Sequence, residues 1–283
     1  MTDLFAGQKV AVIGTGEMGE SLIRGLVEQA VLEPSQVVGT NPLAERNEEM
    51  VSKYGIAVSE ENIVGARDAD LVILAVKPQV APYIFEDLRG HVKPSALVLS
   101  IAAGISIEQL QEGFGHEAVA RSMPNTPAQI GMGITVWTVT ESVTERQKEQ
   151  AKVIFGALGE EVFMEDEAYL DMATALSGSG PAYVFLLMEA MIDAGVHMGF
   201  SRRIARELVF KTIAGSVEYA ERSGKHAAEL RNEVTSPGGT TAEALYHMEK
   251  RSFRTVISRG IWAAYQRSIS LGKGLKTRGP DDL

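Results

Sequence analysis

The chain has 283 residues, of which 45% are hydrophobic, and this size and composition predict a globular protein with two domains. Its 27 basic and 37 acidic residues give a formal net charge of −10, which argues against a binding surface for nucleic acid or anionic membranes. The sequence has no cysteine, so disulfides, thiolate catalysis and cysteine–metal sites are excluded.

The N-terminus and the apolar segments predict a cytoplasmic protein. Residues 1–9 lack a basic stretch followed by a long apolar run, so we expect no signal peptide. We also expect that no apolar run is long enough to span a membrane. The five histidines do not show the spacing of metal ligands, and we therefore expect no metal site.

The first motif is a glycine-rich turn between a strand and a helix. Lys9–Ile13 reads as a buried strand, and Gly14-Thr15-Gly16-Glu17-Met18-Gly19 leads from it into a helical pattern. In such a motif the first glycine permits the tight turn and the second lets the backbone approach a pyrophosphate. The third lets the helix pack on the strand. We predict that residues 14–19 bind a dinucleotide; a glycine-rich turn without a ligand is the alternative.

The end of the next predicted strand, residues 36–40, bears on the choice of cofactor. A protein that prefers NAD usually places Asp or Glu there, where it binds the ribose 2′-hydroxyl. Here Thr40 is followed by Asn41, and Arg46 comes shortly after. Since no carboxylate would repel a 2′-phosphate and Asn41 and Arg46 could bind one, we predict NADPH over NADH, with NADH still possible. The alternative for Arg46 is a solvated position on a helix.

Four more segments complete the pattern of an α/β sheet. They cover residues 70–76, 96–101, 118–122 and 134–139. The first of these is apolar almost throughout, as a parallel strand that is buried on both faces requires. Alternating strands and helices over residues 1–165 therefore predict a doubly wound sheet of the Rossmann type.

After residue 165 the pattern changes, and we expect no strand beyond Phe163. Residues 183–198, 204–219 and 253–271 read as helices, and the first is so apolar that we expect it to be buried. A small bundle cannot cover both the first and the last of these helices. We therefore predict an all-helical second domain, residues 166–283, that forms a homodimer or a ring of dimers. The polar tail, residues 272–283, is expected to be loose.

The second motif is Ser236-Pro237-Gly238-Gly239-Thr240-Thr241, which runs into a helix-forming segment that extends to Glu249. The glycines allow a ligand to approach the backbone, and the free N–H groups of the new helix point at whatever lies in front of them. The two threonines add hydroxyl groups. We interpret this stretch as an anion site; an ordinary helix cap is the alternative.

Taken together, five segments resemble the pyrroline-5-carboxylate reductase family, and the resemblance covers essentially the whole chain. The segments are residues 14–19, 77–78, 123–127, 176–183 and 234–249. The resemblance implies a reductase that makes L-proline from 1-pyrroline-5-carboxylate by hydride transfer from NAD(P)H to a cyclic imine. It also implies a dinucleotide-binding domain and a helical domain that dimerises.

The resemblance further implies roles for particular residues. The cofactor would be held by residues 14–19, by Ala75-Val76-Lys77-Pro78, by Asn62 near the adenosine, and by Ala102 and Ala103 near the nicotinamide ribose. The substrate loop would comprise Ser236, Gly238, Gly239, Thr240 and Thr241, with the Thr241 hydroxyl on the ring nitrogen. Thr240 stands where many members have alanine, which leaves these roles unchanged.

The chemistry of a cyclic imine fits the residues available. A protonated imine carbon accepts a hydride without a nucleophile or a buried general base, so positioning and electrostatics suffice. The alternative of a 3-hydroxyacid dehydrogenase would need a lysine on a helix of the second domain, and residues 183–198 contain none. A second alternative, a non-catalytic NADP-binding regulator, explains residues 8–104 but not the loop of residues 236–241.

Overall fold

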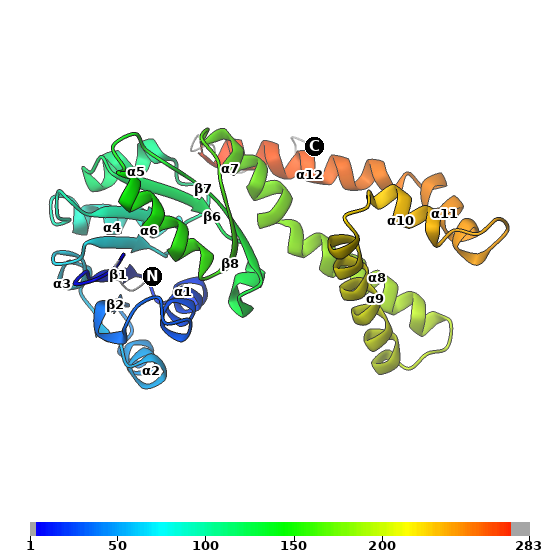
Figure 1. Cartoon of the computed structure of the whole chain (residues 1–283), viewed down its shortest axis with the longest axis horizontal. Helices are drawn as coiled ribbons and strands as arrows, with labels where there is room; N and C mark the ends of the chain where they lie inside the picture. Colours follow the sequence, from blue (N-terminus) through cyan, green and yellow to red (C-terminus); the bar gives the residue numbers. More distant parts are fainter. Residues whose placement is uncertain (1–3, 273–283) are drawn as a thin grey trace. The chain divides into compact units, whose positions relative to one another are not determined.

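The computed structural model describes residues 4–272, which form two compact units (Figure 1). The first unit contains the residues up to Ser179 and returns at Ala264; the second is Gly180–Ala263. These units differ from the two domains that we predicted, residues 1–165 and 166–283, because residues 166–179 and 264–272 pack with the first unit. That residues 1–165 bind the dinucleotide and residues 166–283 bind the substrate stays a prediction. The tail that we expected to be loose falls, beyond Gly272, outside the described residues.

Among the described residues, the first unit is built on one eight-stranded sheet with the order β3-β2-β1-β4-β5-β6-β7-β8. The strands are β1 (Val10–Ile13), β2 (Val37–Thr40), β3 (Ala57–Ser59), β4 (Leu71–Leu74), β5 (Leu97–Ser100), β6 (Val119–Met123), β7 (Gly133–Val139) and β8 (Gly159–Phe163). Neighbouring strands are parallel, except that β7 runs antiparallel to β6. The six predicted strands are confirmed, and the two strands that the sequence did not predict, β3 and β8, form the edges.

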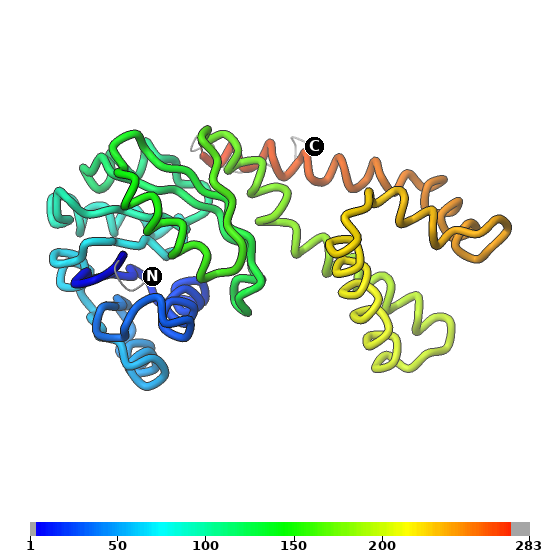
Figure 2. The backbone as a smooth tube through the Cα atoms, viewed as in Figure 1, coloured from blue at the N-terminus to red at the C-terminus, as the bar shows by residue number. Residues whose placement is uncertain are grey.

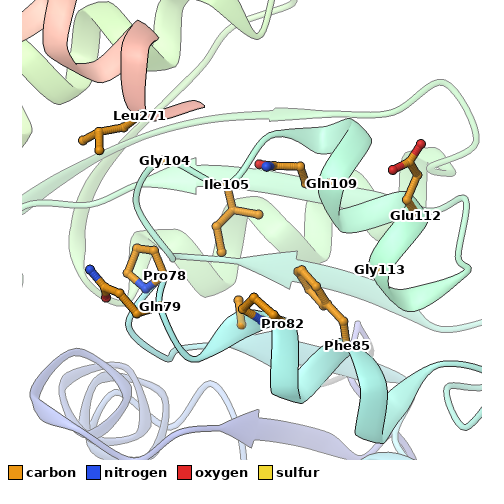
Figure 3. A pocket seen from close by; sticks show the side chains of 11 residues that line it. Pro78, Gln79, Pro82, Phe85, Gly104, Ile105, Gln109, Glu112, Gly113 and Leu271 are labelled. Carbon is orange, nitrogen blue, oxygen red and sulfur yellow. The ribbon is translucent and has the colours of Figure 1, made fainter. Parts of the chain in front are cut away.

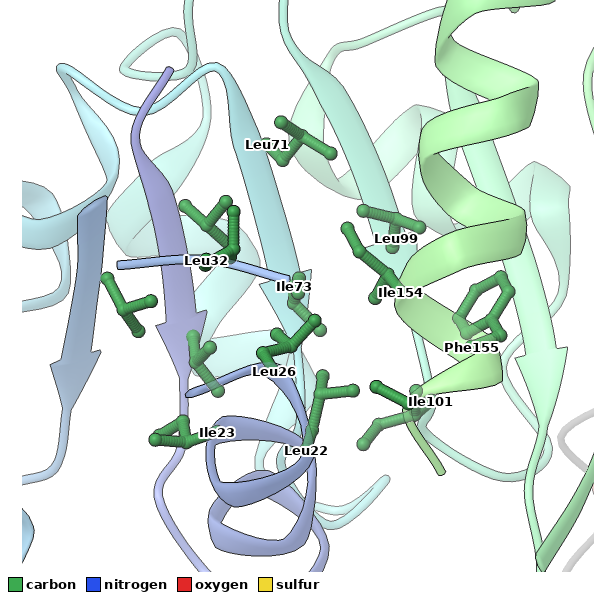
Figure 4. Packing of buried hydrophobic residues seen from close by; sticks show 14 of the residues in the cluster. Leu22, Ile23, Leu26, Leu32, Leu71, Ile73, Leu99, Ile101, Ile154 and Phe155 are labelled. Carbon is green, nitrogen blue, oxygen red and sulfur yellow. The ribbon is translucent and has the colours of Figure 1, made fainter. Parts of the chain in front are cut away.

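Helices cover both faces of this sheet. One face packs against α1 (Glu17–Glu28), α2 (Ala44–Tyr54) and α6 (Glu145–Gly156), and the other against α3 (Asn62–Ala66), α4 (Ala81–Leu88) and α5 (Ile107–Phe114). Figure 4 shows Leu22 and Leu26 of α1 packed with Ile154 of α6 in one cluster. Because both faces are covered, every residue of β1, β4 and β5 is buried. The predicted doubly wound α/β fold is therefore confirmed.

The first unit also includes α7 (Ala168–Ala173), the π-helical turn η3 (Thr174–Gly178) and the end of α12 (Phe253–Gly272). Leu170 of α7 is fully buried against the sheet. Beneath α7 lies Arg121 of β6, whose guanidinium pairs with Glu167 and lies 3.9 Å from Asp171. Asp171 also accepts a hydrogen bond of 2.6 Å from Ser268 of α12. These polar contacts fasten α7 and the end of α12 to the sheet.

The second unit is all helical, as predicted. It consists of α8 (Gly180–His197), α9 (Arg202–Ser223), α10 (Ala227–Glu233), α11 (Thr240–Lys250) and the first part of α12, and Figure 2 follows the backbone through them. The expectation that the apolar helix of residues 183–198 is buried is wrong for a single chain, because Phe185 and Leu186 are 58% and 67% exposed. A helix that is apolar on all sides needs cover on all sides, and α9 packs against only part of α8.

The expectation about membrane-spanning length needs a correction too. The helical run Ala168–His197 is long and apolar enough to cross a membrane by length and composition, with a mean hydropathy of 1.3 over its best window. The run is continuous because the π-helical turn η3 connects α7 to α8, with Ser179 still in a right-handed helical conformation. Core helices of soluble proteins meet the same criterion, so this run is weak evidence for a membrane.

Candidate active site

The glycine-rich turn connects β1 to α1 at the carboxyl edge of the sheet. Gly14 has a φ of +96°, and its N–H donates to the carbonyl of Thr40 over 3.0 Å. A Cβ on Gly19 would lie 2.1 Å from the carbonyl oxygen of Gly14, so only glycine lets α1 pack this closely on the turn. A Cβ on Gly16 would meet nothing within 4 Å. The turn is therefore tight on the protein side and open at Gly16, where a ligand can approach the backbone.

The N-terminus of α1 faces this opening. Gly16 is the N-cap residue, and no side chain within the described part of the chain accepts a hydrogen bond from the first turn there. The first N–H groups of a helix have no partner inside the helix, and together with the helix dipole they favour an anion. These groups are thus available to a pyrophosphate, as the motif predicts.

The residues that follow β2 are tied to the glycine-rich turn. The Asn41 side-chain amide donates to the Thr15 hydroxyl over 3.2 Å, and Thr40 donates to Asn62 over 2.8 Å. Asn62 in turn donates to Asp87 over 3.0 Å. Asn41 and Asn62 therefore lie together at the end of β2, which is where a Rossmann fold binds the adenine ribose.

Arg46 has a more complex environment than the sequence suggested. Its Nε donates to the carbonyl of Thr15 over 2.7 Å, and its other two guanidinium nitrogens pair with Glu20 and Glu49. The side chain is 20% exposed, so the alternative of a solvated helix position is wrong. The pairing of Arg46 with a 2′-phosphate stays a prediction, and such a phosphate would have to share the guanidinium with two carboxylates.

The sequence did not reveal Glu20 as part of this site. Partial burial alone would raise the pKa of its carboxyl, but hydrogen bonds from Arg46, Lys53 and Tyr54 outweigh that effect and lower the pKa to about 2. The spacing of Arg46 and Glu49, three residues apart on one helix, was a readable signal. No sequence signal joins Glu20 on α1 to Arg46 on α2, because their contact depends on how the two helices pack.

Two more predicted cofactor segments lie at the same sheet edge. Residues 75–78 follow β4, and the N–H of Ala75 donates to the carbonyl of Ile13 over 2.8 Å. Ala102 and Ala103 follow β5, next in the sheet. Beyond Pro78 an open hollow of about 500 Å³ lies between α4 and α5 (Figure 3). Its lining includes Pro78, Pro82, Phe85, Ile105, Gln109 and Leu271. The predicted cofactor residues are thus gathered along one edge of the first unit.

The predicted substrate loop lies between α10 and α11 in the second unit. Gly238 has a φ of +68°, and the N–H of Gly239 donates to the carbonyl of Ser236 over 3.0 Å. Gly239 is the N-cap residue of α11, and no described side chain caps this helix. The alternative of an ordinary Ser or Thr cap is therefore wrong. Thr240 is exposed and Thr241 is half-buried, and the free N–H groups of the first turn can receive a small anion.

In the part of the chain that the structure describes, no group of three His, Asp or Glu side chains is arranged to hold a metal ion. Each unit instead has an uncapped helix N-terminus of its own, that of α1 in the first unit and that of α11 in the second. Both favour negatively charged groups, which fits a dinucleotide on the first unit and a carboxylate on the second.

Comparison with known proteins agrees with this arrangement. A family profile for pyrroline-5-carboxylate reductase dimerisation matches residues 167–271, and a profile for NADP oxidoreductase, coenzyme F420-dependent, matches residues 9–104. The pyrroline-5-carboxylate reductase of Pseudomonas aeruginosa is 40% identical over 268 residues, which cover 94% of this chain and 98% of the relative. That of Synechocystis sp. is 38% identical over 265 residues, with coverage of 94% and 98%.

A solved structure gives the same result for the fold. The crystal structure of Plasmodium falciparum pyrroline carboxylate reductase with NADP bound is 32% identical in sequence, with a TM-score of 0.85. The similarity covers 94% of this chain and 98% of that one. With this identity over nearly its full length, the chain belongs to the pyrroline-5-carboxylate reductase family.

Proposed function

We propose that this protein reduces 1-pyrroline-5-carboxylate to L-proline with NAD(P)H, the last step of proline biosynthesis. The observation that carries the proposal is the identity of up to 40% with reductases of that name over almost the whole chain. The proposal is also supported by the two uncapped helix N-termini, since one could bind the phosphates of a dinucleotide and the other a small carboxylate.

The residues of the glycine-rich turn fit a dinucleotide. Gly16 leaves space in front of α1, whereas Gly14 and Gly19 are packed so closely that a Cβ would clash. The N–H groups of the first turn of α1 would hold the pyrophosphate, and the segments after β4 and β5 would hold the nicotinamide half. When bound, the cofactor supplies the hydride.

The loop of residues 236–241 would hold the substrate. In our proposal the N–H group of Thr240 binds its carboxylate, because the N–H of Gly239 that we also expected to bind it already donates to Ser236. The Thr241 hydroxyl accepts a hydrogen bond from the protonated imine nitrogen. That nitrogen is charged before the hydride arrives and neutral afterwards, so Thr241 orients the ring more than it transfers a proton. Catalysis then depends on positioning, which needs no nucleophile.

The proposal includes a preference for NADPH over NADH. It is supported by the absence of Asp and Glu from residues 40–44, at and just beyond the end of β2, and by the relative whose structure has NADP bound. The preference also depends on Arg46, whose guanidinium is already paired with Glu20 and Glu49.

We further propose that the protein is a homodimer, or a ring of dimers, assembled through its helical residues. The match to a dimerisation profile supports this, as does an apolar groove of about 570 Å³ between α8 and α12. The groove is lined by residues that include Tyr183, Leu187, Ala190, Phe253, Ile257 and Ile261. A cytoplasmic location without nucleic-acid or membrane partners completes the proposal and accords with the net charge of −10.

One experiment tests the reaction against its alternatives. Purified protein is given NADPH with 1-pyrroline-5-carboxylate, and in parallel NADP⁺ with a panel of 3-hydroxyacids. We expect oxidation of NADPH by 1-pyrroline-5-carboxylate only, with L-proline formed in equal amount. Turnover of a hydroxyacid would indicate a dehydrogenase instead, and cofactor binding without any turnover would indicate a regulator.

A further inference from the structure

Five side chains of α1 and α2 form a hydrogen-bonded group that we call the Arg46 cluster. Its members are Glu20, Arg46, Glu49, Lys53 and Tyr54. Lys53 lies 3.0 Å from Glu20 and 2.6 Å from Glu49, and the Tyr54 hydroxyl donates to Glu20 over 2.9 Å. The two cations and two carboxylates balance, so the cluster carries no net charge.

The position of the cluster links it to the cofactor site. The Nε of Arg46 donates to the carbonyl of Thr15, which stands between the first two glycines of the turn. The same Thr15 receives a hydrogen bond from Asn41, directly after β2. The guanidinium therefore lies where the glycine-rich turn meets the end of β2, the place at which a Rossmann fold distinguishes a ribose 2′-hydroxyl from a 2′-phosphate.

We propose that Glu20, acting through Arg46, sets the cofactor preference of this enzyme. By pairing with the guanidinium, Glu20 neutralises the charge that a 2′-phosphate would seek, and so it limits the advantage of NADPH over NADH. Glu20 is thus a positioning residue, and the inference rests on the proposed dinucleotide site.

The electrostatics of the pair support this role. The side chains of Arg46 and Glu20 are only 20% and 18% exposed, so solvent and salt screen their interaction less than that of a surface pair. With its pKa lowered to about 2 by its hydrogen bonds, Glu20 remains charged at neutral pH. Lys53 offsets part of the negative charge, but it is 47% exposed, and seven residues of α2, about two helical turns, separate it from Arg46.

The obvious variant, Arg46→Ala, cannot separate this role from a structural one. It would remove the hydrogen bond to Thr15 together with the charge, and a loosened turn would weaken both cofactors. Glu20→Gln leaves Arg46 and its bond to Thr15 in place and replaces the neutralising carboxylate by an uncharged amide of nearly the same shape. Glu45→Gln is the matched control, because Glu45 is exposed on the same helix as Arg46 and none of the described ion pairs includes it.

The measured quantity is the ratio of kcat/KM with NADPH to kcat/KM with NADH. In Glu20→Gln we expect this ratio to rise about 3- to 10-fold. This is the effect expected when a carboxylate no longer competes with the 2′-phosphate for the guanidinium of Arg46. The rise should come from a lower KM for NADPH, with kcat unchanged. Glu20→Asp should stay closer to the wild-type ratio, and Glu45→Gln should change it less than about 2-fold. Structural damage alone would affect both cofactors alike and leave the ratio unchanged.

A binding measurement keeps the test independent of turnover. The affinities of 2′,5′-ADP and 5′-AMP, measured by calorimetry, report the same preference without substrate. An unchanged ratio in Glu20→Gln, or an equal rise in Glu45→Gln, would overturn the inference even if the enzyme makes proline. If the protein does not reduce 1-pyrroline-5-carboxylate but 2′,5′-ADP binds more tightly to Glu20→Gln alone, the inference stands and the proposed reaction fails.

Discussion

In the first unit every residue of β1, β4 and β5 is buried, whereas in the second unit only Gly195, Ala205 and Val209 are. The first unit covers its apolar strands with its own helices on both faces. The second unit leaves large side chains such as Phe185 and Trp262 more than half exposed. Exposed apolar area on this scale is typical of a surface that another protein covers.

The difference has a consequence for the site. The predicted cofactor residues belong to a unit that is complete in itself, while the predicted substrate loop starts a helix, α11, that has no buried residue in a single chain. We infer that the cofactor half of the site is formed by folding alone and that the substrate half depends on assembly. Each prediction below tests one side of this contrast.

The largest effect is expected from a charge placed in the apolar groove of the second unit. Leu187→Asp puts a carboxylate among Tyr183, Ile257 and their neighbours. An unpaired charge that an interface buries costs several kcal/mol, so we expect a monomer and a loss of activity of at least about 100-fold. Light scattering at micromolar concentration gives the mass, and binding of 2′,5′-ADP checks that the first unit remains folded.

Val51→Asp provides the matched control for that variant. Val51 is 46% exposed on α2 of the first unit, so the same substitution there should leave the oligomer and the activity in place. If the wild-type protein is a fully active monomer at this concentration, the inference that the substrate half of the site depends on assembly is refuted.

The next largest effect concerns the substrate loop. Thr241→Ala should lower kcat/KM for 1-pyrroline-5-carboxylate by about 10- to 150-fold, the equivalent of one hydrogen bond to a charged group of about 1.5–3 kcal/mol. Thr241→Ser keeps the hydroxyl and should keep most of the rate. Thr240→Ala should do little, because only the backbone of Thr240 is assigned a role. NADPH affinity should be unchanged in all three variants.

Two outcomes would change the assignment of the threonines. If Thr240→Ala is slow and Thr241→Ala is not, the hydroxyl that contacts the nitrogen belongs to Thr240. If neither variant is slow, the substrate binds elsewhere and the uncapped start of α11 has another purpose.

The same contrast explains which parts of the fold the sequence predicted. The fully buried strands β1, β4 and β5 are nearly continuous apolar runs, and all three were predictable. The edge strands were not, because Ala57–Ser59 is short and Gly159–Phe163 contains Glu160 and Glu161, so neither shows the pattern of a buried strand. The helix of residues 183–198 was correctly placed but wrongly expected to be buried, since its apolar pattern does not say whether the cover comes from its own chain.

The candidate site divides in a similar way. The two glycine motifs were readable because a local backbone geometry demands those residues. The pairing of Glu20 with Arg46, and the buried Arg121 under α7, were not readable, because each joins residues far apart in the chain. Contacts of this kind follow from how helices and strands pack, and a single sequence carries no local trace of them.

A third prediction uses the Arg46 cluster of the first unit. The pKa of Glu20 is lowered from 4.5 to about 2, so its carboxylate stabilises the fold fully above about pH 4.5, and this contribution is lost as the pH falls toward 2. A lowering of this size corresponds to a contribution of roughly 3 kcal/mol to the free energy of unfolding. We expect a contribution of about 2 kcal/mol, because solvent screens the charge of half-exposed Lys53. The advantage of the wild type over Glu20→Gln should thus shrink in acid.

Urea unfolding at a fixed protein concentration, repeated between pH 7 and pH 2, measures that difference. Glu45→Gln serves again as the control and should differ little from the wild type at every pH. A difference between wild type and Glu20→Gln that stays constant down to pH 2 would show that the Glu20 carboxylate has an ordinary pKa.

The smallest effect concerns the end of α12, which begins in the second unit and ends in the first. Ser268 is 4% exposed, and its hydroxyl donates to Asp171 over 2.6 Å. Ser268→Ala removes this bond, but Asp171 keeps the charge of Arg121 at 3.9 Å and is reached by water, so we expect a cost of about 1 kcal/mol. In a protein of this size that lowers Tm by about 2–4 °C.

Ser270→Ala is the matched control for this last variant. Ser270 lies on the same turn of α12, but its hydroxyl donates to the carbonyl of Gln266 within the helix over 2.8 Å. Its loss should change the stability by less than about 0.5 kcal/mol. A larger shift in Ser268→Ala than in Ser270→Ala means that the bond to Asp171 holds the end of α12 on the first unit. Equal shifts would mean that apolar packing alone holds the end of α12 on the first unit. The hydrogen bond from Ser268 to Asp171 would then contribute nothing measurable to the stability of the protein.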